Sequence, residues 1–312
     1  MNGKIRKINN FEVNGKMVKF IERKPTFVGA DTKGIDRKFL NLAYADGQRN
    51  QLDIYLPNQE QSNYPVIIDV YGGGMYFGEK SSNKLNGALQ LLKRRYAVVS
   101  PNYSLSYMAD FPQPIYELKA VIRWVKAHAD QYHFDDQNVF LMGESSGAQL
   151  AMLTAASEAN NQLQSEFGGN LSYSSQVNGV IASYGPYDLA MMPAQFAVLG
   201  QTPKFSETGA ADSFEGMMLG QQRPLDVPDL NVAVNPKTYL NKHMIPVLMY
   251  AGKQDRVVPY IQTINLAAEV AQKIGSQNVE LHIVPDAPHG PSGFMNGTVF
   301  AQKEQFLQRN LH

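Results

Sequence analysis

The chain has 312 residues, of which 44% are hydrophobic and 18% are charged, and this balance argues against a disordered, collagenous or coiled-coil protein. Its 28 basic residues equal its 28 acidic residues, so no net charge would attract nucleic acid or anionic lipid. The absence of cysteine excludes disulfides, thiolate metal sites and a cysteine nucleophile.

The N-terminal stretch from Met1 to Phe20 contains basic side chains but neither an apolar core nor a small-residue cleavage site. No later segment reaches the length of a membrane span. We therefore expect a cytoplasmic protein that binds neither membranes nor nucleic acid. The length suits a single domain around one large sheet.

Strands and helices alternate along the chain after an opening hairpin. Residues 37–57 contain two alternating stretches around the turn-forming pair Asp46-Gly47, which predicts this hairpin. Apolar runs predict strands at 65–71, 96–100, 138–142, 177–184, 245–251 and 279–284, and helical spacing predicts helices at 85–92, 115–125, from about 146, and at 261–274. Such alternation favours a mainly parallel sheet with helices on both faces.

Two segments lie outside this alternation. Residues 1–36 form an N-terminal extension before the first predicted strand. From about 189 to 236 the periodicity is lost, and proline, glycine and methionine become frequent in a stretch too long for an ordinary connection. We expect this second segment to be a cap insertion.

Residues 143–147, Gly-Glu-Ser-Ser-Gly, match the pattern G-x-S-x-G between a predicted strand and a helix that begins with small residues. A serine on such a sharp turn needs strained backbone angles and neighbours without bulky side chains. Free N–H groups at the helix start favour a developing negative charge. The motif therefore predicts Ser145 as a nucleophile.

A serine nucleophile needs a histidine to take its proton and an acid to orient that histidine. Besides the terminal His312, only His282 and His289 follow the last predicted helix, and His282 lies inside a predicted strand. His289 lies in the loop after that strand, at the sheet edge where the serine turn also lies. We therefore predict His289 as the base.

Asp255 is the predicted acid, because it follows the strand 245–251 at the same edge of the sheet. The chain order is then Ser, Asp, His, as in α/β-hydrolases. The alternative is Asp286, but a residue three positions before the histidine in a proline-bounded loop is badly placed to hold its ring.

Tyr71-Gly72-Gly73-Gly74 follows the strand 65–71 and is a candidate oxyanion loop. Backbone N–H groups can approach a developing oxyanion only where side chains are missing. We predict the N–H groups of Gly73, Gly74 and Ser146 as the donors.

Together these motifs resemble the carboxylesterase branch of the α/β-hydrolases, the hormone-sensitive-lipase-like and xylan-esterase-like enzymes. The likeness covers roughly residues 52–289 and also includes the segments Leu52–Pro57, Ser100–Ser106 and Ser183–Leu189. It implies an α/β-hydrolase fold with an eight-stranded sheet, no cofactor, and hydrolysis through an acyl-enzyme.

The chain departs from the family pattern beside the expected acyl pocket. Tyr71 stands where lipase-like members have histidine, which is more similar to the branch that acts on acetyl or feruloyl esters. Ser146 and Ala148 stand where the family usually has residues smaller by one step. These departures leave the predicted triad intact but put the substrate preference in doubt.

We expect a serine carboxylesterase for small or short-acyl esters, including acetyl or aromatic ones, without cofactor or metal. Its expected partner is the small-molecule ester, and a homodimer is left open. The residues predicted to contact substrate are Met75, Tyr76, Glu144, Met191 and Met192, although core packing is the alternative for each methionine. An amidase or peptidase could use the same triad, and a non-catalytic ligand-binding homologue is the remaining alternative.

Overall fold

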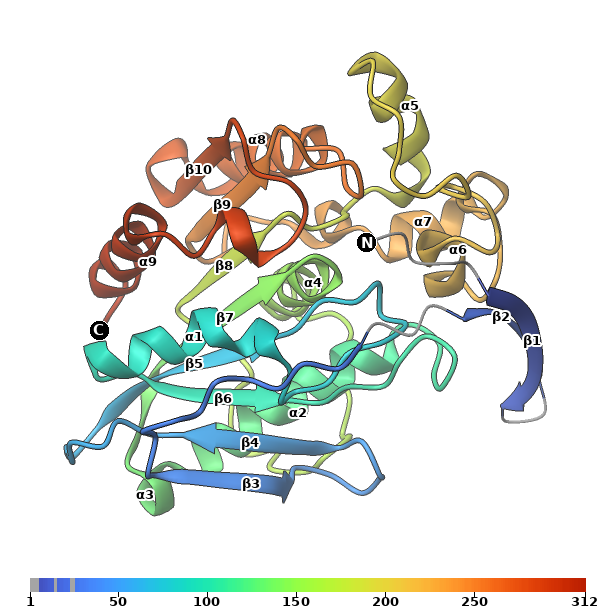
Figure 1. Ribbon diagram of the computed structural model, residues 1–312. Helices are drawn as coiled ribbons and strands as arrows, with labels where there is room; N and C mark the ends of the chain where they lie inside the picture. The colour runs from blue at the N-terminus through green and yellow to red at the C-terminus, as the bar shows by residue number, and fades with distance from the viewer. Residues whose placement is uncertain (1–5, 14–15, 23–25) are drawn as a thin grey trace.

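The computed structural model describes residues 6–13, 16–22 and 26–312 (Figure 1). The predicted N-terminal extension, residues 1–36, therefore lies partly outside the described residues. Within it, β1 (Arg6–Val13) and β2 (Lys16–Glu22) pair antiparallel in a sheet of their own.

The main sheet has eight strands in the order β10-β9-β8-β7-β5-β6-β4-β3. Only β3 with β4 and β4 with β6 pair antiparallel, and the other neighbours are parallel. The predicted mainly parallel eight-stranded sheet is thus confirmed. Its strands are β3 (Lys38–Ala43), β4 (Gln51–Tyr55), β5 (Tyr64–Val70), β6 (Ala97–Pro101), β7 (Phe134–Glu144), β8 (Gly179–Ser183), β9 (Val247–Gly252) and β10 (Val279–Val284).

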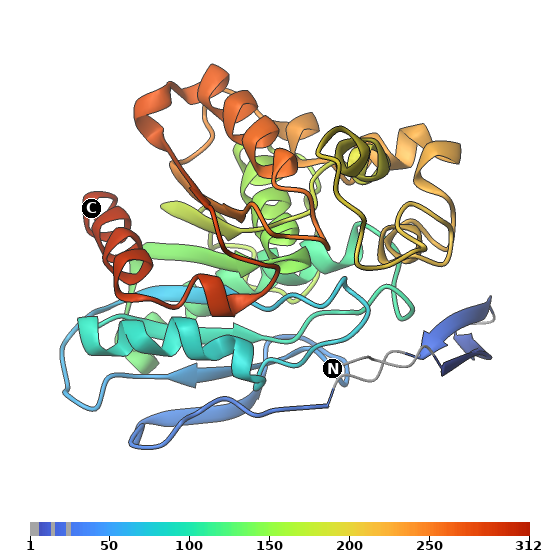
Figure 2. The same ribbon diagram turned by 45° about the horizontal axis from the view of Figure 1, so that its top comes forward.

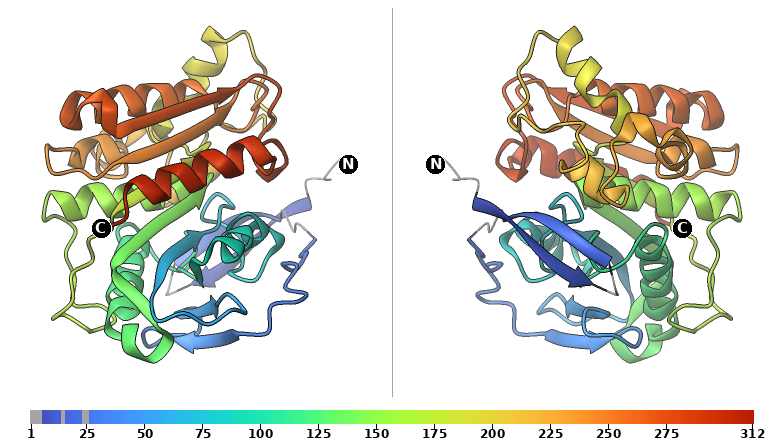
Figure 3. Two further views of the ribbon diagram at one scale, coloured as in Figure 1. Left: turned by 90° about the vertical axis from the view of Figure 1, so that its left-hand side faces the viewer. Right: turned by 90° about the vertical axis from the view of Figure 1, so that its right-hand side faces the viewer.

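Helices cover both faces of this sheet, as the views in Figure 3 show. Successive residues of a strand point to opposite faces, so Val66 and Ile68 pack with the helices of one layer, while Ile67 packs with those of the other. The first layer contains α2 (Gln113–Ala127), α4 (Ser146–Ala159) and α8 (Ile261–Ile274). The second contains α1 (Asn86–Leu89), the adjoining 3₁₀ turns η1 (Asn83–Leu85) and η2 (Gln90–Arg94), and α9 (Gly297–Arg309).

Smaller elements complete the main body. They are α3 (Ala129–Tyr132) before β7, and the 3₁₀ turns η6 (Ser276–Asn278) and η7 (Pro291–Gly293) on either side of β10. No helix of the part that the structure describes is long and apolar enough to cross a membrane.

The segment between β8 and β9 consists of short helices without strands. These helices are η3 (Leu189–Met191), α5 (Met192–Val198), α6 (Phe214–Met218), η4 (Pro224–Asp226), α7 (Pro228–Ala233) and η5 (Pro236–Tyr239). Figures 1 and 2 show α5, α6 and α7 beyond the edge at which the parallel strands end. The loops that follow β5, β7, β9 and β10 meet at this same edge.

Candidate active site

Ser145 lies on the tight turn between β7 and α4, with φ of 52° and ψ of −127°. A residue other than glycine is strained at these backbone angles, so the surrounding structure has to stabilise the turn. The Ser145 N–H donates to the Ser183 carbonyl at 2.9 Å, and α4 packs so closely that a Cβ on Gly147 would collide with the Val70 carbonyl oxygen. Position 147 therefore has no space for a side chain, as the turn motif predicts.

The structure brings Ser145, His289 and Asp255 into one hydrogen-bonded chain. The Ser145 hydroxyl lies 2.9 Å from His289 Nε2, and His289 Nδ1 lies 2.6 Å from Asp255 Oδ2. With Asp255 ionised, Nδ1–H donates to the carboxylate, which leaves Nε2 free to accept from the serine hydroxyl. This arrangement can move the hydroxyl proton onto the imidazole.

Asp255 is fully buried, and its second oxygen is also bound. Oδ1 accepts hydrogen bonds from the N–H groups of Val257 and Val258 at 2.8 and 2.9 Å. The loop after β9 therefore holds the carboxylate in place independently of its hydrogen bond to His289. Asp286, the alternative acid, is exposed, whereas Asp255 holds the imidazole nitrogen.

The predicted oxyanion loop follows β5 and packs against the start of α4. Gly73 N–H donates to the side-chain oxygen of Ser146 at 3.1 Å, and so does Met75 N–H. Because Gly73 N–H already has this acceptor, the prediction that it binds the oxyanion gains no support from this geometry. Ser146 stays a candidate donor, since the first N–H of a helix has no intrahelical acceptor. Gly74, in the loop after β5, stays a candidate donor as predicted from the sequence.

Gly74 needs its missing side chain, because its φ is 63° and a Cβ would collide with the Phe214 ring. This contact also shows that α6 of the 189–236 segment packs on the oxyanion loop. On the other side of the site, Lys204 N–H donates to the Arg256 carbonyl at 2.6 Å, next to Asp255. The segment thus touches loops on both sides of the candidate triad.

Of the residues predicted to contact substrate, Met75 and Tyr76 adjoin the oxyanion loop. Both are buried, and the Tyr76 ring packs against Phe214 with centroids 5.9 Å apart. Met192 instead lies fully buried in the core, and Met191 is 46% exposed beside a separate surface hollow that includes no triad residue. Core packing accounts for Met192, and the prediction of a substrate contact gains no support for either Met192 or Met191.

Glu144 was also predicted to contact substrate, but protein groups bind both of its carboxylate oxygens. Tyr184 donates its hydroxyl proton to Oε2 at 2.6 Å, and Lys84 Nζ lies 3.4 Å from Oε1. The carboxylate is thus turned toward other side chains. Sequence reasoning missed Lys84 and Tyr184, although Tyr184 lies in the segment Ser183–Leu189 that resembles the esterase family.

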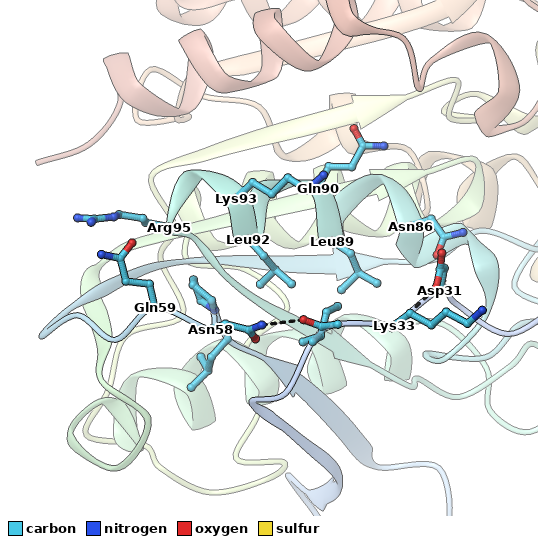
Figure 4. Close-up of a pocket in the computed structure, with 14 residues that line it drawn as sticks. Asp31, Lys33, Asn58, Gln59, Asn86, Leu89, Gln90, Leu92, Lys93 and Arg95 are labelled. Carbon is cyan, nitrogen blue, oxygen red and sulfur yellow. Dashed lines mark hydrogen bonds between the residues drawn. The ribbon is translucent and has the colours of Figure 1, made fainter.

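A separate hollow of about 590 Å³ lies between α1 with η2 and the segments at residues 31–35 and 56–59, and Figure 4 draws its lining. Leu89 of α1 and Leu92 of η2 point into it, and Asn58 lies on the opposite wall. Its lining contains no residue of the candidate triad or of the oxyanion loop. We therefore assign it no part in the candidate active site.

Known proteins share this fold and sequence pattern. The BD-FAE family model matches residues 52–270. The probable isoprenylcysteine alpha-carbonyl methylesterase ICMEL1 of Arabidopsis thaliana is 28% identical over 243 residues, covering 76% of this chain and 48% of that protein. The esterase LipQ of Mycobacterium tuberculosis is 28% identical over 254 residues, covering 78% and 54%. The chain spans about half the length of these curated relatives.

A solved structure is also similar to this chain, over nearly the whole length of both. A truncated form of a carbohydrate esterase from gut microbiota superposes with a TM-score of 0.79 and 28% identity, covering 90% of this chain and 99% of that one. The family match covers more than half of the chain. The chain therefore belongs to the BD-FAE family and has the α/β-hydrolase fold of its esterase relatives.

Proposed function

We propose that the protein is a serine carboxylesterase that hydrolyses small or short-acyl esters through an acyl-enzyme. The observation that carries the proposal is the hydrogen-bonded chain from Ser145 through His289 to Asp255, at the start of α4 and beside the glycine loop after β5. A serine in such a chain can attack a carbonyl carbon because its proton has an acceptor.

In the proposed reaction, Ser145 Oγ bonds to the ester carbonyl carbon while its proton passes to His289 Nε2. The N–H groups of Gly74 and Ser146 stabilise the negative oxygen, and each such donor is typically worth ~3 kcal/mol in the transition state. The C–O bond to the alcohol then breaks, and the alcohol leaves with the proton from His289. Water attacks the acyl-enzyme in the same way, which releases the acid and restores Ser145.

The substrate class rests on the site and on the names of similar proteins. Two proteins similar to this chain are named as a methylesterase and a carbohydrate esterase, which supports an ester substrate. Buried Met75 and Tyr76 place apolar surface next to the oxyanion loop, which suits an uncharged acyl group. We further propose that residues 189–236 act as a cap, because Phe214 packs on Gly74, and that the protein is cytoplasmic.

The test compares the wild type with Ser145→Ala on p-nitrophenyl acetate and on the matching anilide. We expect ester turnover by the wild type, little anilide turnover, and loss of ester turnover in the variant. Ser172→Ala removes an exposed serine hydroxyl and is the matched control. Near-normal ester turnover by Ser145→Ala would refute the proposal, and faster turnover of the anilide would identify an amidase instead.

A further inference from the structure

A second polar network lies beside the candidate triad and centres on the carboxylate of Glu144. This residue directly precedes Ser145, so its backbone position is tied to the serine turn. Oε2 accepts the Tyr184 hydroxyl proton at 2.6 Å, and Oε1 pairs with Lys84 Nζ at 3.4 Å. One carboxylate therefore joins a tyrosine after β8 to a lysine in η1.

Lys84 connects this carboxylate to the oxyanion loop. Its Nζ donates a hydrogen bond to the Gly72 carbonyl oxygen at 2.7 Å. Gly72 lies two positions before Gly74, the candidate oxyanion donor. An ammonium group that holds both Gly72 and Glu144 keeps the loop at a set distance from the serine turn.

Tyr184 connects the same carboxylate to the candidate base. Its ring packs against His289 with centroids 4.9 Å apart and an angle of 67° between the rings, and Phe294 packs on it at 4.9 Å. The Tyr184 N–H also donates to the Tyr250 carbonyl at 2.6 Å. The hydrogen bond to Glu144 restricts the rotation of the Tyr184 side chain that these packing contacts leave possible.

Burial makes these bonds persistent. Tyr184 is 2% exposed, and burial together with the Glu144 charge raises the pKa of its phenol well above the usual value. The phenol therefore keeps its proton and donates to the carboxylate across the working pH range. Hydrogen bonds to charged groups are also stronger than neutral ones at such sites.

We propose that Glu144 is a positioning residue that sets the oxyanion loop through Lys84 and the imidazole through Tyr184. The inference rests on the proposed function, since it assigns roles around Ser145 and His289. Glu144, Lys84 and Tyr184 act as one unit that raises kcat and leaves KM unchanged.

Three substitutions test this unit while keeping side-chain shape: Tyr184→Phe, Glu144→Gln and Lys84→Met. Each should lower kcat on p-nitrophenyl acetate about tenfold, equivalent to ~1.4 kcal/mol, with KM unchanged. The double variant Tyr184→Phe/Glu144→Gln should be slower than Glu144→Gln alone by less than the product of the two single losses, because both changes act on the same hydrogen bond. Titration with a fluorophosphonate corrects each rate for the folded, reactive fraction.

Glu144→Gln provides a readout that a purely structural role would not move. The groups around the imidazole and its supports are Asp255 from the loop after β9, Asp69 on β5, Lys84 in η1 and Lys303 on α9. Loss of the Glu144 charge leaves Lys84 unneutralised, which disfavours a protonated imidazole. The acid limb of the kcat/KM profile should therefore move to lower pH.

Tyr250→Phe is the matched control, because Tyr250 is another buried tyrosine that packs on Phe294 but bonds Gln302 instead of Glu144. The inference is overturned if Tyr184→Phe is as active as Tyr250→Phe, if the two losses multiply in the double variant, or if the acid limb stays in place. Ser145→Ala is assayed in the same series. Activity in that variant would refute the proposed function itself, whereas its inactivity beside a fully active Tyr184→Phe would refute only the positioning role.

Discussion

At the residue scale, the candidate acid and base are held by groups that take no part in the proposed chemistry. Asp255 is an example, since two backbone N–H groups bind the oxygen that does not face His289. The carboxylate can then serve only one purpose, which is to hold Nδ1–H and to stabilise the imidazolium that forms. We therefore expect kcat to depend strongly on the charge of Asp255 and little on neighbouring acids.

Asp255→Asn should lower kcat by about 10⁴-fold with little change in fold, since an amide favours the wrong imidazole tautomer. Asp286→Asn, which alters an exposed acid three residues before His289, is the control and should keep wild-type activity. Initial rates on p-nitrophenyl acetate measure both. Equal losses in the two variants, or none in Asp255→Asn, would mean that the acid has been assigned wrongly.

Sequence alone could predict Ser145, His289 and Asp255 because each has a local signature: a turn motif, or a loop directly after a predicted strand. The supports could not be predicted in the same way. Tyr184 and Lys84 lie 40 and 60 residues from Glu144 in the sequence. No sequence pattern around either residue indicates that it contacts Glu144. Gly73 was assigned a free N–H because its acceptor, the Ser146 hydroxyl, is 73 residues away.

At the element scale, the oxyanion loop and α4 form one unit through the Ser146 side chain. Its oxygen accepts hydrogen bonds from two loop N–H groups, those of Gly73 and Met75. The position is usually occupied by a smaller residue in the family that the chain resembles, so the hydroxyl is a feature of this chain. It gives the loop an anchor at the beginning of the helix.

Ser146→Ala should lower both the melting temperature and kcat, because two buried N–H groups lose their acceptor at a cost of ~1–3 kcal/mol. Ser157→Ala removes a buried hydroxyl further along α4 that bonds only within the helix, and should leave kcat unchanged. Thermal unfolding and steady-state kinetics on both variants provide the measurement. Unaltered kcat in Ser146→Ala would show that the loop does not need this anchor.

Elements with strong periodicity were predictable, and those with weak periodicity were not. The helix predicted at 85–92 is instead one α-helical turn between 3₁₀ turns, in a stretch that includes the poor helix former Gly87. No prediction was made for α9, of which only Val299, Phe306 and Leu307 are buried. So few buried positions give little apolar signal along the sequence.

At the scale of the whole molecule, strand and helix alternation predicted the mainly parallel sheet, while the position of β5 between β6 and β7 follows from pairing between distant segments. The central strands are so deeply buried that a charge on them affects global stability. Asp69 on β5 shows this, because burial raises the pKa of its carboxyl from 3.8 to about 8.

A carboxyl whose pKa is higher in the folded state favours folding less as it ionises. The free energy of unfolding should therefore fall as pH rises from about 4 to about 8 through this window, and Asp69→Asn should remove that dependence. The melting temperature of Asp69→Asn minus that of the wild type should increase between pH 5 and pH 8, over that same window. The exposed Asp226→Asn serves as the control. A difference independent of pH would contradict the raised pKa.

The central claim is that Ser145 is the nucleophile activated by His289, and a fluorophosphonate probe tests it most directly. The probe bonds covalently to activated serines, so peptide mapping by mass spectrometry identifies the modified residue. We predict a single adduct on Ser145 in the wild type and a greatly slowed reaction in His289→Ala. Labelling of any other serine, or labelling of Ser145 at an unchanged rate in His289→Ala, would contradict the account.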